Sequence, residues 1–258
     1  MTESNIRFIE TNQNRCSAYL EEYKKQISIP YDDFLEYFIL ESTFYLIEID
    51  GQQCGFFGIH ENLLTILFID ELHFTYGNEL FSEIKRRYPI QKAFVPTTDI
   101  AALSIILENY KEIKIQALHF TDTNRPVRPP EFDKELFRQA EMTDLDEIQK
   151  IAGDFVEDYA AKITAKELYV LEKDEEILGI GVLEINRIMD NCIGTGMLTK
   201  ESQRGRGVGR SIILHLKAIV YDMGMTPVPG CWYYNTNSRK TLESAGYISK
   251  SKLLHVIL

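Results

Sequence analysis

The sequence predicts an α/β (α+β) protein that contains two copies of one fold, and two observations support this prediction. The first is an internal repeat: FYLIEIDGQQCG at Phe44–Gly55 matches LYVLEKDEEILG at Leu168–Gly179 with a constant offset of 124 residues. Each segment reads as a strand, a tight turn and a second strand. The second is Thr199–Met223, where the end of a strand is followed by a glycine-rich turn and an amphipathic helix.

The glycine-rich turn predicts a phosphate-binding site. It spans Arg204–Gly209, and the apolar residues after it recur at helical spacing, so a helix is expected to begin at or near Val208. Backbone N–H groups at a helix N-terminus lack intrahelical acceptors, and the helix dipole adds partial positive charge there. Glycines let the backbone approach a phosphate closely. Formal positive charge is added by Arg204, Arg206 and Arg210.

The spacing of the glycines distinguishes between phosphate motifs. No Lys-Ser or Lys-Thr pair follows them, as a P-loop requires, and the third glycine of a dinucleotide fingerprint is replaced by Arg210. The pattern present is R-x-x-G-x-G at Arg204, Gly207 and Gly209. It resembles the pyrophosphate loop of the GNAT superfamily, the acetyl-CoA-dependent N-acetyltransferases.

A second stretch, Gly230–Tyr247, reads as a short strand followed by a helix that is capped near Asn235 or Asn237 and ended by Gly246. It resembles the GNAT pattern N-x-x-A-x-x-x-Y-x-x-x-G-F/Y at the same distance after the loop. Leu242 stands where the family often has a tyrosine that protonates the departing thiolate. The positions that fit the pattern are Asn235, Ser238, Gly246 and Tyr247.

The resemblance implies two GNAT-like domains, each a mixed central sheet flanked by helices, with a splayed strand pair in the C-terminal copy. The N-terminal copy is degenerate, because its equivalent of the loop region has Gly77 as its only glycine and Thr98 stands where Asn235 sits. A segment with three prolines between the copies reads as a linker. The predicted parts are a degenerate domain at 1–122, a linker at 123–133 and an acetyl-CoA-binding domain at 134–258.

By the same resemblance, the protein is expected to transfer an acetyl group from acetyl-CoA, its cosubstrate, to a primary amine by direct attack. The diphosphate would lie on the glycine loop, the pantetheine arm would pair with the preceding strand, and an N–H near Leu198 would stabilise the oxyanion. The residues expected to bind the coenzyme are Met197, Leu198, Thr199, Arg204, Gly205, Arg206, Gly207, Val208, Gly209, Arg210, Asn235 and Ser238.

The sequence assigns no catalytic base or acid. With Leu242 in place of the family tyrosine, Tyr234 is the candidate acid and Tyr233 could replace it, although both also read as aromatic packing at a strand end. Cys231 reads as a nucleophile or as a small buried residue. A thiolate can also leave without help, because a thiol pKa lies only a unit or two above neutral.

Composition restricts the partners. The chain has 258 residues, 45% of them hydrophobic, and a net charge of −11, which argues against nucleic acid or an anionic membrane as the main partner. The start has no leader pattern, no stretch approaches membrane-spanning length, and the histidines and cysteines form no metal-ligand pattern. We expect a cytoplasmic, metal-free monomer or homodimer that acts on a small-molecule or peptide amine.

Two other functions fit parts of the sequence. The chain could be a catalytically idle sensor or scaffold that binds CoA or acyl-CoA, which Leu242 and the degenerate first copy favour. Alternatively, the glycine loop could hold a nucleotide in a protein-interaction module, although the second motif argues against this.

Overall fold

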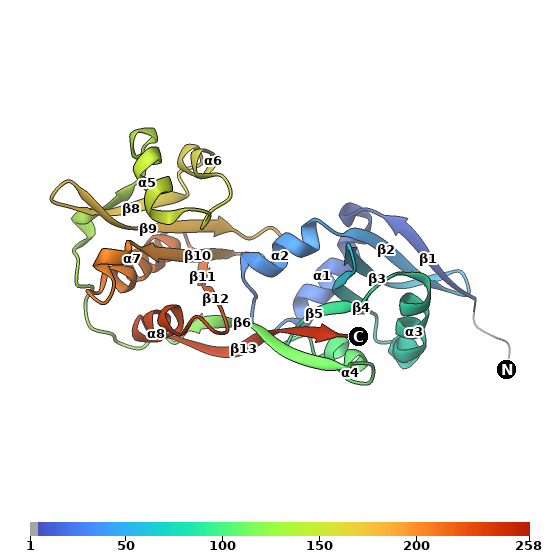
Figure 1. Cartoon of the computed structure of the whole chain (residues 1–258). Helices are drawn as coiled ribbons and strands as arrows, with labels where there is room; N and C mark the ends of the chain where they lie inside the picture. Colours follow the sequence, from blue (N-terminus) through green and yellow to red (C-terminus); the bar gives the residue numbers. More distant parts are fainter. Residues whose placement is uncertain (1–4) are drawn as a thin grey trace. The chain divides into compact units, whose positions relative to one another are not determined.

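The computed structural model describes residues 5–258, and Met1–Ser4, the start of the predicted N-terminal domain, lie outside the described residues. The chain forms two compact units (Figure 1). One comprises the residues up to Leu118 together with Ser251–Leu258, and the other comprises His119–Lys250. Each unit has a β-sheet with helices packed on it, so the predicted α/β class with two similar domains is confirmed.

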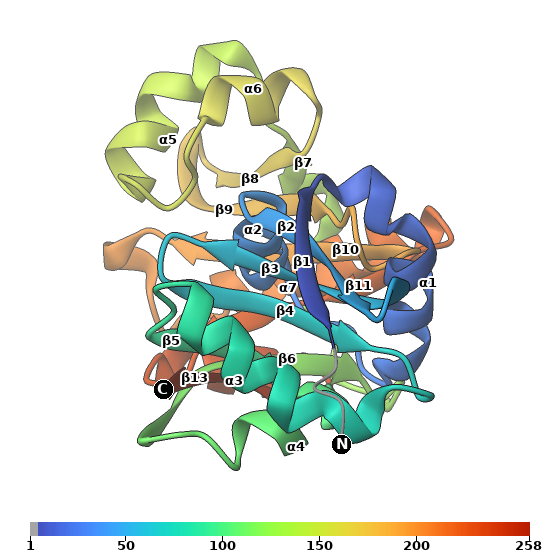
Figure 2. The same ribbon diagram turned by 90° about the vertical axis from the view of Figure 1, so that its right-hand side faces the viewer.

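In the first unit, the strand order is β1-β2-β3-β4-β5-β13-β6. Its strands are β1 (Ile6–Thr11), β2 (Thr43–Ile49), β3 (Gln52–His60), β4 (Leu63–Ile69), β5 (Lys92–Pro96), the end of β13 (Tyr247–Ile257) and the start of β6 (Glu112–Asp122). Its helices are α1 (Ser17–Gln26), α2 (Asp33–Leu40), α3 (Gly77–Arg87) and α4 (Ile100–Ile106). The apolar sides of α3 and α4 pack into one core with the strands of this sheet. In Figure 2, α3 lies in front of the sheet.

In the second unit, the sheet order is β11-β10-β9-β8-β7. Its strands are β7 (Phe137–Gln139), β8 (Leu168–Lys173), β9 (Glu176–Ile185), β10 (Cys192–Thr199) and β11 (Thr226–Val228), and β12 (Gly230–Trp232) lies beside β6. Its helices are α5 (Leu145–Ala152), α6 (Tyr159–Thr164), α7 (Val208–Asp222) and α8 (Thr236–Ser244). Short 3-10 turns occur at Gln13–Cys16, Phe74–Tyr76, Lys134–Leu136, Met142–Asp144 and Glu201–Gln203.

Both faces of this sheet are buried. Side chains alternate along a strand, so Val170 packs in the core beneath α5 and α6 whereas Leu171 packs against α7. Figure 1 shows α5 and α6 on one side of β8 and β9, and α7 on the other. The near-continuous apolar strands of the second copy are therefore explained by helices on both sides.

The internal repeat corresponds to a repeated backbone geometry. A Cβ atom at Gly55 would lie 2.1 Å from the Phe68 carbonyl oxygen, and a Cβ atom at Gly179 would lie 2.6 Å from the Leu198 carbonyl oxygen. Both glycines thus allow the second strand of the hairpin to approach the backbone of the next strand. The two hairpins also carry a β-bulge at matching positions. The repeat is confirmed as two copies of the same local structure.

The final strand of each copy extends into the other unit. Residues 253–257 of β13 pair antiparallel with residues 92–96 of β5. The end of β6 lies beside β12, where the Phe120 N–H donates to the Pro229 carbonyl at 3.1 Å. The two copies defined by the sequence repeat therefore do not coincide with the two compact units. The end of the last strand of each copy belongs to the other unit.

The helix starts that follow β5 and β12 are capped in the same way. The Asp99 carboxylate accepts a hydrogen bond from the Ala102 N–H at 3.0 Å, and the Asn235 side-chain oxygen accepts one from the Ser238 N–H at 3.0 Å. The counterpart of Asn235 in the first copy is therefore Asp99, one residue beyond the position that the sequence indicated, Thr98.

We expect Asp99 to make stability depend on pH. Burial raises the pKa of Asp99 to about 7, whereas an unfolded aspartate titrates near about 4. Between these values the folded chain binds more protons than the unfolded chain, so the free energy of unfolding falls as the pH rises through this window. Asp99→Asn retains the capping oxygen and should flatten the dependence of Tm on pH between about 4 and 7.

The measurement is a set of thermal melts of both proteins across this pH range. The pKa of buried His119 is lowered to about 4 by desolvation, which gives the opposite slope and is common to both proteins. Only the difference between the two curves therefore reports on Asp99. Parallel curves would contradict the prediction.

Candidate functional site

The predicted loop and helix form at the end of β10. The 3-10 turn Glu201–Gln203 leads into the glycine-rich turn, and α7 begins at Val208, as the sequence predicted. Gly205 and Gly207 adopt φ values of +78° and +86°, in the left-handed region that favours glycine. The first turn of α7 and the backbone before it therefore present N–H groups of the kind that binds anions.

One edge of β10 is open. The neighbouring strand β11 pairs with it only from Cys192 to Gly194, and β12 belongs to the other sheet. Within residues 5–258, no strand is hydrogen-bonded to this edge of β10 after Gly194. This is the splayed strand arrangement that the fold prediction contained.

Two backbone hydrogen bonds show which residues of β10 face the open edge. The Asn191 carbonyl accepts from the Thr226 N–H toward β11, and the Lys200 N–H donates to the Leu178 carbonyl toward β9. Because backbone groups alternate along a strand, Met197 and Thr199 direct their N–H and C=O groups to the open edge. Leu198 directs its N–H and C=O groups toward β9. The backbone N–H that was expected near Leu198 to stabilise the oxyanion therefore belongs to a neighbouring residue.

A cavity of about 780 Å³ connects the loop, the open edge of β10 and the start of α8. All but one of the twelve residues predicted to bind the coenzyme line it, and the exception is Arg206. Those that line the cavity are Met197, Leu198, Thr199, Arg204, Gly205, Gly207, Val208, Gly209, Arg210, Asn235 and Ser238.

The charge of the lining favours an anion. Four cationic residues line the cavity, and no aspartate or glutamate occurs among the lining residues. The chain as a whole carries a net charge of −11, so this concentration of positive charge is local. The cationic residues are Arg128, Arg204, Arg210 and Lys240.

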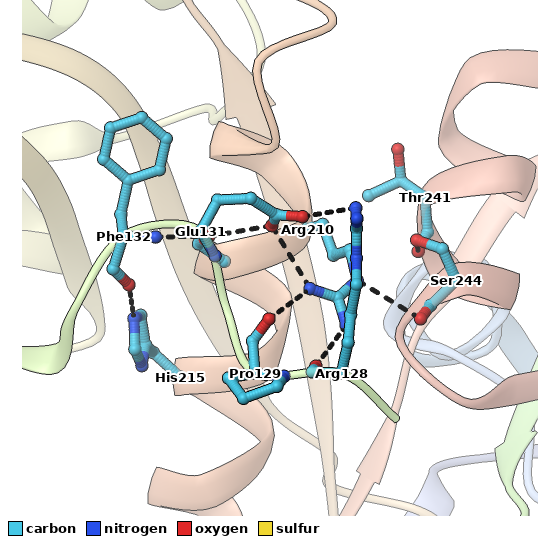
Figure 3. Close-up of polar contacts among 9 residues, drawn as sticks. Arg128, Pro129, Glu131, Phe132, Arg210, His215, Thr241 and Ser244 are labelled. Carbon is cyan, nitrogen blue, oxygen red and sulfur yellow. Dashed lines mark hydrogen bonds and ion pairs between the residues drawn. The ribbon is translucent and has the colours of Figure 1, made fainter. Parts of the chain in front are cut away.

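Arg210 differs from the other three because its side chain is buried, with 5% exposure. Its guanidinium donates to the carbonyls of Pro129 at 2.9 Å, Ser244 at 3.3 Å and Arg128, and it pairs with Glu131 at 3.2 Å (Figure 3). The side chain is therefore engaged within the chain. What Arg210 can offer a ligand is its backbone N–H in the first turn of α7.

The segment predicted as a linker packs along α7. The Ser211 hydroxyl accepts hydrogen bonds from the N–H groups of Glu131 and Phe132, at 3.0 and 3.1 Å, and a ring nitrogen of His215 lies 2.8 Å from the Phe132 carbonyl oxygen. This packing brings Arg128 to the cavity, and sequence reasoning missed that residue. The sequence did contain a signal for this packing, because polar residues such as Ser211 and His215 occur on the buried side of α7 and need hydrogen-bond partners there.

Apolar and aromatic residues also line the cavity. Cys231 and Leu242 are buried, and Phe155 and Trp232 are partly exposed. Tyr234 is 64% exposed, stacks edge-on against Trp232 with a centroid distance of 5.1 Å, and is not one of the lining residues. The role of Tyr234 as an acid stays a prediction.

In the part of the chain that the structure describes, no cluster of three or more His, Cys, Asp and Glu side chains is placed to hold a metal ion. Across the same residues, no helix has both the length and the apolar character needed to cross a bilayer.

Residues 12–123 match the family model described as an acetyltransferase (GNAT) domain. The match falls on the copy that lacks the glycine loop. No curated protein matches the chain significantly.

Solved structures match nearly the whole chain. A GNAT-family acetyltransferase from Colwellia psychrerythraea is similar over 98% of this chain and 99% of its own, with a TM-score of 0.88 and 17% identity. A tandem GNAT protein from the clavulanic acid biosynthesis pathway is similar over 98% of both chains, with a TM-score of 0.61 and 8% identity. A GCN5-related N-acetyltransferase from Sphaerobacter thermophilus covers 97% of this chain and 95% of its own, with a TM-score of 0.59 and 12% identity.

Proposed function

The chain has the fold of the tandem GNAT proteins, and from this premise we propose that its second copy is an acetyl-CoA-dependent N-acetyltransferase that acts on a primary amine by direct attack. The observation that carries the proposal is the cavity, which joins a cationic glycine loop to an unpaired strand edge. An anionic, amide-containing ligand fits both features, because the loop suits phosphates and the strand edge suits amides.

In this proposal the coenzyme diphosphate lies against the backbone N–H groups from Gly205 to Gly209. The pantetheine amides pair with Met197 and Thr199, as an added strand would. The thioester then lies near Thr195, where the strands separate, and a backbone N–H at this edge stabilises the oxyanion.

The amine attacks the thioester carbon, the bond from carbon to sulfur breaks, and the coenzyme leaves as a thiolate. The attacking amine loses a proton to water or to a group that lies beside the bound amine substrate. The thiolate needs no strong acid, because a free thiol has a pKa of about 8.5. This matches the presence of Leu242, a buried apolar residue, in the cavity lining.

Ligand binding tests the first half of the proposal. Thermal melts with acetyl-CoA, CoA, ATP and NAD should show stabilisation by the two CoA species alone. Stabilisation by ATP or NAD instead would support the nucleotide-binding alternative.

Thiol release from acetyl-CoA, measured with a panel of amines, tests the second half of the proposal. At least one amine should raise the release above hydrolysis. Coenzyme binding without release by any amine would identify a sensor rather than an enzyme.

Direct attack also predicts that Cys231 is dispensable for chemistry. Although Cys231 is one of the cavity-lining residues, no acetyl-enzyme forms if the amine attacks acetyl-CoA itself. Cys231→Ser should therefore retain kcat within about threefold, and mass spectrometry of the wild type incubated with acetyl-CoA should show no acetyl adduct. An adduct that disappears in Cys231→Ser, with a large loss of kcat, would indicate a covalent route.

A further inference from the structure

Building on the proposed function, we propose that Arg128, on the segment between the two copies, binds a phosphate group of the coenzyme. In this arrangement the buried Arg210 is a positioning residue that holds Arg128 at the cavity. Arg128 thus joins the arginines from which the sequence predicted positive charge at this site, whereas the side chain of Arg210 acts through Arg128.

The backbone around Arg128 is fixed at successive points. Its own carbonyl and that of Pro129 accept hydrogen bonds from the guanidinium of Arg210. Further along, the Ser211 hydroxyl on α7 accepts hydrogen bonds from the N–H groups of Glu131 and Phe132. A ring nitrogen of His215, also on α7, lies within hydrogen-bond distance of the Phe132 carbonyl oxygen (Figure 3). The position of Arg128 relative to the start of α7 is therefore set by contacts that do not involve its side chain.

The Arg128 side chain has the properties of a ligand-binding group. It lines the cavity, is 73% exposed, and is held on one side by an ion pair with Glu131. A guanidinium has five N–H donors in a planar fork that matches a phosphate, so one ion pair leaves donors for a ligand. By contrast, the donors of Arg210 are taken up by carbonyls and Glu131.

Glu131 links the two arginines to the loop. Its carboxylate pairs with both guanidinium groups, so the three side chains together keep one net positive charge. Glu131 also lies against Gly207, where an added Cβ atom would be 2.6 Å from the carboxyl carbon. The glycine at this place in the loop thus gives room to the side chain that orients Arg128.

CoA offers two phosphate sources, the diphosphate and the 3′-phosphate, and the experiment distinguishes them. Dissociation constants are measured for acetyl-CoA, for acetyl-3′-dephospho-CoA and for acetyl-pantetheine, which has no phosphate. The variants are Arg128→Ala and, as the matched control, Arg125→Ala. Arg125 lies in the same segment and donates to the Glu243 carbonyl, and it is not one of the cavity-lining residues.

We expect Arg128→Ala to weaken acetyl-CoA binding by about 10- to 50-fold, in line with loss of a charge-assisted contact. Binding of acetyl-pantetheine should be unchanged, and Arg125→Ala should stay within about twofold of the wild type. An equal loss for acetyl-3′-dephospho-CoA assigns Arg128 to the diphosphate, and no loss for that ligand assigns it to the 3′-phosphate.

Three outcomes would overturn the inference: wild-type affinity in Arg128→Ala, an equal loss in Arg125→Ala, or an equal loss for acetyl-pantetheine. The second outcome would show a general effect of charge. A wild-type protein that binds none of the three ligands would instead refute the proposed function. The two failures are therefore distinguishable.

Discussion

Gly205→Glu should abolish acetyl-CoA binding, whereas Gly205→Gln should preserve much of it. A Cβ atom at Gly205 would have no neighbour within 4 Å, so either side chain fits. Both variants carry the same strain from the φ of +78°. They differ in charge alone, and a carboxylate about 4 Å from a phosphate costs on the order of 4 kcal/mol at an effective dielectric constant of 20.

The measurement is the dissociation constant for acetyl-CoA of each variant, with Tm as the check on folding. We expect Gly205→Glu to bind at least about 100-fold more weakly than Gly205→Gln. Equal affinities would show that the diphosphate does not lie at this turn. Gly207 is less suitable for the test, because a side chain there would collide with Glu131 and lower stability as well.

The second large effect is expected on stability. Arg210→Ala should lower the free energy of unfolding by about 3–5 kcal/mol, because it leaves three carbonyls and the partly buried Glu131 without their shared donor. This corresponds to a decrease in Tm of about 10 °C. Arg210→Lys should recover little of the loss, because an ammonium cannot span the same acceptors.

The matched control is Arg206→Ala, which removes the same charge from an exposed position in the neighbouring turn. It should change stability by less than about 0.5 kcal/mol. Denaturant unfolding of the three variants and the wild type gives the comparison. If Arg210→Ala unfolds like Arg206→Ala, Arg210 does not hold the segment against α7.

Local signals in the sequence predicted local structure well. The start of α7 at Val208 and the cap at Asn235 follow from helical periodicity, from the position of the glycines and from the preference of asparagine for the N-cap. These features depend on residues within a few positions of one another. The hairpin repeat was identified by matching two segments at a constant offset, and the structure places the bulge, the turn and the close-packed glycine within each of these short segments.

Long-range contacts account for what the sequence did not predict. Nothing near Arg210 in the chain indicates that Glu131 and the carbonyls of Arg128 and Pro129 would engage its side chain. Three prolines made the segment around Arg128 read as a plain linker. Such pairings are set by tertiary packing, which local propensity does not encode.

The reciprocal placement of β6 and β13 has a consequence for synthesis of the protein. The strand that completes the first unit beside β5 leaves the ribosome only after the whole second copy has been made. Until then, the backbone of β5 presents an open edge, the kind of surface from which aggregation begins. The N-terminal copy is therefore not expected to complete its folding before the C-terminal copy has been synthesised. Either copy produced by itself should be poorly soluble.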